Sequence, residues 1–180
     1  MNVIDQSPRV TARIAGWFYV IVFVFGIYSI LSRSRFAFTA AMIAGVIYIA
    51  VSVLFYFVFK PASPKLSLVA AIVSLAGIVI GPASIVFNPA ARISPLVFFA
   101  IYCSLIAVLI FKSSFLPRFL GVLMLLASAG WFTFISQSFA TSLAPYIFLP
   151  GIIGEGALTT WLVLFGVNEK RWKEQLDSLH

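Results

Sequence analysis

Six long apolar stretches run along the chain, separated by short segments that hold most of its charged residues. Each stretch is about long enough to cross the roughly 30 Å hydrocarbon core of a bilayer as an α-helix, which rises about 1.5 Å per residue. We therefore predict an all-α integral membrane bundle of six transmembrane helices. The six stretches are 14–31, 36–59, 66–87, 93–111, 119–135 and 145–165.

The composition supports a membrane protein. Hydrophobic residues make up 62% of the chain, against roughly 45–50% in a soluble domain. Charged residues make up 9%, against about 25%, and the mean hydropathy is +1.11. A soluble domain of 180 residues cannot bury that much apolar surface. This composition excludes a disordered chain, a disulfide scaffold and a nucleic-acid-binding domain.

The Lys and Arg residues are distributed unequally between the two sides of the predicted bundle. One side, which includes both termini, holds nine of them, and the other holds three, at Arg33, Arg35 and Arg92. Because cytoplasmic loops carry the excess of basic residues, we predict that both termini lie in the cytoplasm, in the inner membrane of a bacterium. This bias also explains the net charge of +7 without a nucleic-acid partner. The nine residues are Arg9, Arg13, Lys60, Lys65, Lys112, Arg118, Lys170, Arg171 and Lys173.

Three regions follow from this topology: a cytoplasmic N-terminal segment (1–13), the six-helix transmembrane domain (14–166) and a cytoplasmic amphipathic helix (167–180). In the last region, apolar side chains recur at helical spacing between charged ones. We expect this helix to lie at the membrane interface or to continue the sixth span, and a docking surface for a soluble partner is the alternative. The residues predicted to contact lipid headgroups are Lys170, Arg171, Trp172 and Lys173.

The rare residue types exclude several kinds of chemistry. The chain has a single cysteine, Cys103, and a single histidine, His180, which is its last residue. An intramolecular disulfide, a Cys-x-x-Cys zinc site and a bis-histidine haem site within the chain therefore cannot form. A terminal residue is also a poor place for the ordered histidine that a Ser-His-Asp triad needs. We predict no metal site, no cofactor and no catalytic residue, and we expect that the protein is not an enzyme.

Glu155 is the one acidic residue inside a predicted span, about ten residues from each end of it. An acid at the centre of a membrane helix costs about 2.5–3.5 kcal/mol on insertion scales, and such residues usually face the interior of the bundle. No basic residue falls at the same depth, so we expect the carboxyl to be neutral. If the sixth helix instead starts at Pro150, Glu155 lies in the outer leaflet near water.

Three further residues complete the candidate binding site around Glu155. Gly151, Glu155 and Thr159 are spaced four residues apart and therefore share one helical face. Gly151 allows a neighbouring helix to approach closely, and Thr159 offers a hydroxyl group. Tyr102 falls at a similar depth in the fourth span. Glu155 is either a hydrogen-bonding lock between helices or part of a ligand, ion or proton site.

Three parts of the sequence are distinctive when taken together: 12–16, 115–121, and 153–155 followed by 161–162 and 166–168. They resemble a bacterial family of multi-pass membrane proteins known as a domain of unknown function (DUF4386). The resemblance implies a six-helix bacterial membrane protein over nearly the whole chain. It also implies that Glu155 is the intramembrane glutamate of the family, and it implies no activity.

Three functional hypotheses remain open from the sequence. The first is a membrane protein that binds or transports a small molecule or lipid around Glu155. The second is a non-catalytic subunit or scaffold of a larger membrane complex, in which Glu155 only fixes helix packing. The third is an intramembrane lipid enzyme, for which only Glu155, Tyr102, Cys103 and hydroxyl groups are available. The expected partners are membrane lipids and a second copy of the chain or another membrane protein.

Overall fold

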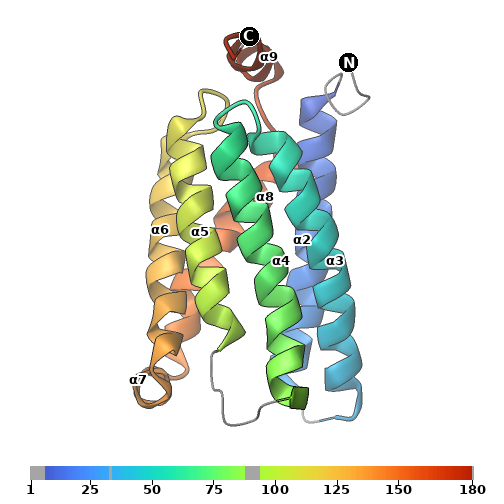
Figure 1. Ribbon diagram of the computed structural model, residues 1–180, viewed down its shortest axis with the longest axis vertical. Helices are drawn as coiled ribbons and strands as arrows, with labels where there is room; N and C mark the ends of the chain where they lie inside the picture. Colours follow the sequence, from blue (N-terminus) through green and yellow to red (C-terminus); the bar gives the residue numbers. More distant parts are fainter. Residues whose placement is uncertain (1–6, 33, 88–93, 180) are drawn as a thin grey trace.

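A computed structural model of the protein describes residues 7–32, 34–87 and 94–179, and over these residues it contains helices and no strand. Both termini of the described chain lie at the same end of the molecule (Figure 1). The elements in chain order are α2 (Pro8–Leu31), α3 (Phe36–Phe59), α4 (Pro64–Phe87), α5 (Pro95–Lys112), α6 (Arg118–Phe132), η1 (Thr133–Ile135), α7 (Gln137–Leu143), η2 (Tyr146–Phe148), α8 (Leu149–Leu164) and α9 (Glu169–Asp177).

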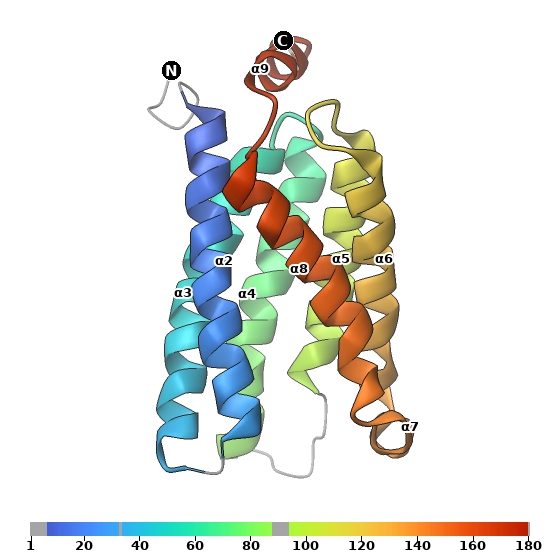
Figure 2. The same ribbon diagram turned by 180° about the vertical axis from the view of Figure 1, so that it is seen from behind.

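The six long helices α2, α3, α4, α5, α6 and α8 pack side by side in chain order, and α8 closes the ring against α2. Figure 1 shows the helices standing roughly parallel, and Figure 2 shows α8 crossing obliquely between α2 and α6. Short connections between consecutive helices place neighbours in sequence next to one another in space.

Four helices of the described chain are long and apolar enough to cross a membrane. Two shorter apolar helices, Pro64–Ile80 and Leu96–Lys112, lie between them in the sequence. The all-helical fold of the described residues and the presence of helices that could span a membrane are thus confirmed, while the count of six spans stays a prediction. The four long spans are Pro8–Ser29, Phe36–Phe59, Arg118–Ile135 and Tyr146–Leu164.

The predicted stretches agree with the helices to within three residues, except at the first and the sixth. The second stretch, 36–59, coincides with α3, whereas α2 begins at Pro8, six residues before the first stretch. The sixth, 145–165, begins with the 3-10 turn η2 and becomes α-helical at Leu149, and together they form the apolar segment Tyr146–Leu164. The depth of Glu155 in a membrane stays a prediction. Glu155 lies six residues after the start of α8 and nine before its end. The short helix α7 was not predicted.

The contact between α2 and α8 joins segments about 150 residues apart in sequence. A Cβ atom on Gly16 would lie 2.9 Å from the backbone nitrogen of Val163, so only glycine permits this approach. The Arg13 guanidinium donates through Nε to the carbonyl oxygen of Val163, at 3.0 Å. Gly166 has a φ of +66° and ends α8, because this left-handed conformation suits glycine.

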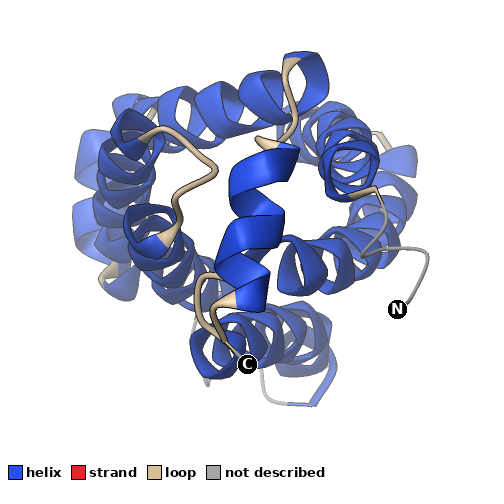
Figure 3. Cartoon of the chain, turned by 90° about the horizontal axis from the view of Figure 1, so that it is seen from above, coloured by secondary structure: helices blue, strands red, loops and turns tan. Residues whose placement is uncertain are grey.

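The last helix, α9, lies across the end of the ring that carries both termini (Figure 3). The indole of Trp172 is 1% exposed and donates to the carbonyl oxygen of Val58, at 2.8 Å. Gln175 donates to the carbonyl oxygen of Lys112, at 2.9 Å, and accepts from the backbone of Ser114, at 2.8 Å. These contacts fasten α9 to α3 on one side and to the end of α5 on the other.

This docking corrects two expectations for the C-terminal region. The helix does not continue the sixth span, because Gly166 separates α9 from α8. The prediction that Trp172 contacts lipid headgroups is wrong, because its ring is packed inside the protein. Arg171 is exposed, but its guanidinium donates to the carbonyl oxygen of Ser114. Lys170 and Lys173 are exposed, and their contact with headgroups stays a prediction.

Because α8 packs closely on α6, we predict that alanine substitutions at two nearby glycines change the stability of the protein very differently. A Cβ atom on Gly154 would lie 2.2 Å from the carbonyl oxygen of Leu123, whereas one on Gly156 would meet nothing within 4 Å. Gly154→Ala should therefore destabilise the protein by about 1–3 kcal/mol, because the two helices must separate. Gly156→Ala should leave stability unchanged or raise it slightly. The midpoint of thermal unfolding in detergent measures both, and equal midpoints for the two variants would contradict this packing.

Candidate functional site

Glu155 lies inside the ring, 2% exposed, and three other helices donate hydrogen bonds to its carboxyl group. The hydroxyl of Tyr19 on α2 donates to Oε2 at 2.6 Å. The indole nitrogen of Trp131 on α6 donates to Oε1 at 2.5 Å. The thiol of Cys103 on α5 donates to the same oxygen, with sulfur and oxygen 3.9 Å apart. One carboxyl group thus joins α8 to α2, α5 and α6.

Gly151 makes room for one of these donors. It lies one helical turn before Glu155, and a Cβ atom on it would lie 2.4 Å from Cζ2 of Trp131. The indole ring therefore occupies the space that a side chain at position 151 would fill. In that position its N–H points at the carboxyl group on the next turn of α8. Gly151 acts on the site by positioning Trp131.

Tyr19 is brought to Glu155 by a row of small residues on α2. Ala12, Ala15 and Gly16 precede Tyr19 at spacings of three and four residues, and all four are buried. These positions share one face of the helix. Because the small side chains allow α2 to approach α8 closely, the longer side chain of Tyr19 reaches the carboxyl group.

Aromatic rings extend from this site across the bundle. The ring centroids of Tyr19 and Tyr48 are 5.7 Å apart, and those of Tyr48 and Tyr102 are 6.0 Å apart. The hydroxyl groups of Tyr48, Tyr102 and Thr159 are buried and have no hydrogen-bond partner among the described residues. Unsatisfied buried hydroxyl groups are uncommon in folded proteins, and this site holds three of them near one carboxyl group.

The structure brings together only part of the site predicted from the sequence. Glu155 and Gly151 both contact Trp131, as described above. Tyr102 is buried without a hydrogen bond to Glu155, and the next residue, Cys103, makes that contact instead. Thr159 is buried on α8, and its hydroxyl does not bond to the carboxyl group.

The candidate site predicted from the sequence left out all three donors, although Cys103 was named with Glu155 among the groups available to an enzyme. A count of depth along each helix would have pointed to them. Tyr19 lies 10 residues from Arg9, Cys103 lies 9 from Lys112, and Trp131 lies 13 from Arg118. These basic residues all belong to the end of the bundle that carries the termini. The polar side chains of α2, α5 and α6 therefore fall at comparable depths, close to that of Glu155.

A cavity of about 430 Å³ opens beside Glu155. Its wall includes Tyr19 and Gly26 from α2, Trp131 from α6, and Ile152 and Glu155 from α8. Glu155 is the one acidic residue of the lining, and the remaining wall is almost entirely apolar. This volume is within the range of small-molecule sites, roughly 300–1,000 Å³.

The rim of this cavity lies between α2 and α8. Ile27, Leu31 and Ile152 line it and are exposed on the outside of the bundle. Figure 2 shows why: α8 meets α2 near the termini and then crosses toward α6, so the two helices diverge at the opposite end. The cavity therefore opens sideways through the wall of the bundle.

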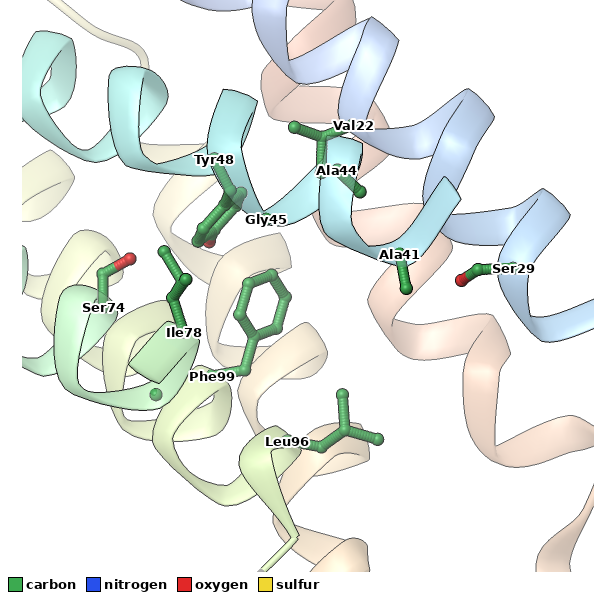
Figure 4. Close-up of a pocket in the computed structure, with 11 residues that line it drawn as sticks. Val22, Ser29, Ala41, Ala44, Gly45, Tyr48, Ser74, Ile78, Leu96 and Phe99 are labelled. Atoms are coloured by element: carbon green, nitrogen blue, oxygen red, sulfur yellow. The ribbon is translucent and has the colours of Figure 1, made fainter. Parts of the chain in front are cut away.

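A second cavity of about 440 Å³ lies between α2, α3, α4 and α5. Figure 4 shows Tyr48 and Phe99 close together in its lining, with Ser29 on α2 farther away. Val22 and Phe99 line both cavities and therefore stand between them. Over the described residues, no three His, Cys, Asp or Glu side chains gather where they could hold a metal ion.

The family comparison bears on most of this site. Residues 86–166 match the family model of the domain of unknown function DUF4386. The resemblance seen in the sequence is thereby confirmed over just under half of the chain, which includes the segments 115–121 and 153–155 but not 12–16. No curated protein and no solved structure matches the chain. The DUF4386 region contains Cys103, Trp131 and Glu155, whereas Tyr19 lies outside it.

The hydrogen bonds to Glu155 predict that removing the hydroxyl group destabilises the protein at Tyr19 but not at Tyr102. Tyr19→Phe removes a hydrogen bond to a buried carboxyl group and should destabilise the protein by about 1–3 kcal/mol. Tyr102→Phe should have little effect or stabilise the protein, because its hydroxyl has no partner to lose. Denaturation in mixed detergent micelles measures both variants. An equal loss of stability in the two would show that the hydroxyl of Tyr19 is not what secures Glu155.

Proposed function

We propose that this protein is a multi-pass membrane protein that binds a small hydrophobic molecule in the cavity beside Glu155. The observation that carries the proposal is the position of one buried carboxyl group on the wall of an otherwise apolar cavity of about 430 Å³. Pockets that are mostly apolar, with few well-placed polar groups, are typical of small-molecule sites. The lateral opening between α2 and α8 supports entry of the ligand from the lipid phase.

Binding is favoured over catalysis by the position of the thiol. Cys103 is the nucleophile next to Glu155, but it does not line the cavity. A covalent mechanism requires the nucleophile to reach the substrate. We therefore propose a binding or carrier role without a chemical step.

The proposal includes six membrane spans, with both termini in the cytoplasm, in the inner membrane of a bacterium. It is supported by the nine basic residues that belong to the end of the bundle with the termini and α9. On this arrangement α9 lies on the cytoplasmic side, and both cavities lie toward the outer half of the membrane.

This orientation predicts which introduced cysteines react from outside the cell. In intact bacterial cells, a membrane-impermeant maleimide should label Ser142→Cys, at the end of the bundle far from the termini. Ser178→Cys, after α9, should be labelled only in inside-out vesicles. Both positions are exposed, and the native Cys103 is buried, so the unmodified protein serves as the unlabelled control. Labelling of Ser178→Cys in intact cells would reverse the topology.

A second candidate function is a scaffold subunit that holds a second copy or another membrane protein. The observation that favours it is that the hydrogen bonds of Glu155 join four helices, which is what a packing lock requires. In a scaffold the cavity has no ligand, so filling it should change nothing but stability.

The cavity offers a matched pair of substitutions that separates the two functions. A Cβ atom on either Gly26 or Gly156 meets nothing within 4 Å, but only Gly26 lines the cavity beside Glu155. Gly26→Leu should fill the cavity, whereas Gly156→Leu should leave it open. Native mass spectrometry of protein extracted in mild detergent should find a retained molecule on the unmodified protein and on Gly156→Leu, but not on Gly26→Leu. The same spectrum for all three, with or without adducts, would contradict the proposal.

A further inference from the structure

The ligand class follows from the charge of the cavity wall. We infer that the molecule bound beside Glu155 is a hydrophobic organic cation, whose positive group pairs with the carboxyl group and whose apolar body fills the cavity. This inference rests on the proposed binding function and narrows it to one class of ligand.

The first argument is a missing counter-charge. The groups that donate to Glu155 are a hydroxyl, an indole N–H and a thiol, all of them neutral. The other titratable groups packed around it, Tyr48 on α3 and Tyr102 on α5, carry no positive charge either. Among the described residues, no Lys, Arg or His forms an ion pair with the carboxyl group.

These neutral donors stabilise an ionised carboxyl group but leave its negative charge without a positive partner. Indole N–H can only donate, so Trp131 favours an oxygen that is free to accept. A buried carboxylate without a cationic partner is costly in a low dielectric, and its charge is neutralised either by a proton or by a positive group. A cation in the cavity would supply that group directly, because Glu155 forms part of the cavity wall.

The second argument is the aromatic lining. Rings of Tyr19, Phe23, Phe99, Trp131 and Phe148 border the cavity that Glu155 faces. The ring centroids of Phe99 and Trp131 are 5.7 Å apart, and those of Trp131 and Phe148 are 6.1 Å apart. The negative faces of aromatic rings attract cations, most strongly for Trp. Aromatic rings beside a carboxylate are therefore suited to an ammonium or another onium group.

The third argument distinguishes an organic cation from a metal ion. Calcium takes six to eight oxygen ligands and magnesium demands six, often including water. The cavity provides one carboxyl group and an apolar wall, so an inorganic ion would lose its hydration without replacement. The exposed apolar rim of Ile27, Leu31 and Ile152 instead favours entry of a molecule that partitions into lipid.

The test compares two molecules of the same shape that differ in charge. Benzyltrimethylammonium and neopentylbenzene are isosteres, in which a quaternary nitrogen of the first is replaced by carbon in the second. Equilibrium dialysis of each radiolabelled probe against the full-length protein in lipid nanodiscs, with empty nanodiscs subtracted, measures saturable binding. We expect the cation to bind at least about tenfold more tightly than the neutral probe, a difference of about 1.4 kcal/mol. Binding of the cation should weaken as the pH falls, because protons compete for the same carboxyl group.

Variants of Glu155 test whether the preference for the cationic probe comes from its carboxyl group. Glu155→Gln should bind benzyltrimethylammonium about tenfold more weakly, and this binding should no longer depend on pH. Glu155→Asp should keep a preference for the cation over the neutral probe. Gly26→Leu should abolish binding, and Gly156→Leu should bind as the unmodified protein does. The comparison of the two probes on the unmodified protein needs no variant, so it holds even if Glu155→Gln does not fold.

Failure of this inference is distinguishable from failure of the proposed function. If both probes bind equally and Gly26→Leu abolishes binding of both, the cavity is a binding site but its ligand is not selected by positive charge. If neither probe binds saturably, or if Gly26→Leu binds as well as Gly156→Leu, both the cation and the cavity site are overturned.

Discussion

The structure depends on the hydrogen bonds of one carboxyl group. Glu155 accepts from Tyr19, Cys103 and Trp131, which come from three different helices, α2, α5 and α6. In an apolar environment, polar side chains find no water and must satisfy one another. The four helices that meet at this carboxyl group therefore have one arrangement in which its hydrogen bonds are made.

Small residues set the distances that those hydrogen bonds require. Gly16 allows α2 to lie against α8, Gly154 allows α8 to lie against α6, and Gly151 leaves space for the indole of Trp131. Association of helices in a membrane relies on close packing more than on the hydrophobic effect, because lipid is as apolar as the side chains. Glycines and the buried acid thus act together, since the acid finds its donors only at this short helix separation.

The two ends of the bundle differ in a way that fits a binding role. At the end with the termini, α9 lies across the ring, and Trp172 fills the space above α3 through its contact with Val58. Away from that end, α8 diverges from α2, and the cavity beside Glu155 opens between them. The packed end holds the helices in place, and the diverging end provides space beside a polar group. A scaffold would have no need of this asymmetry.

The sequence by itself determined most of the long helices, since apolar stretches bounded by charged residues predicted α3 at both ends. It also located the lone acid among them. It could not assign the donors to Glu155 or the cavity. Helices that are apolar on every side have no polar stripe to show which face points inward, so periodicity does not identify neighbours. Trp172 has basic neighbours in the sequence and was therefore wrongly assigned to lipid headgroups. Only the fold showed that its indole packs inside the protein and donates to the carbonyl oxygen of Val58. Tertiary structure decided which polar groups meet, because each hydrogen bond to Glu155 comes from another helix, 24 to 136 residues away in sequence.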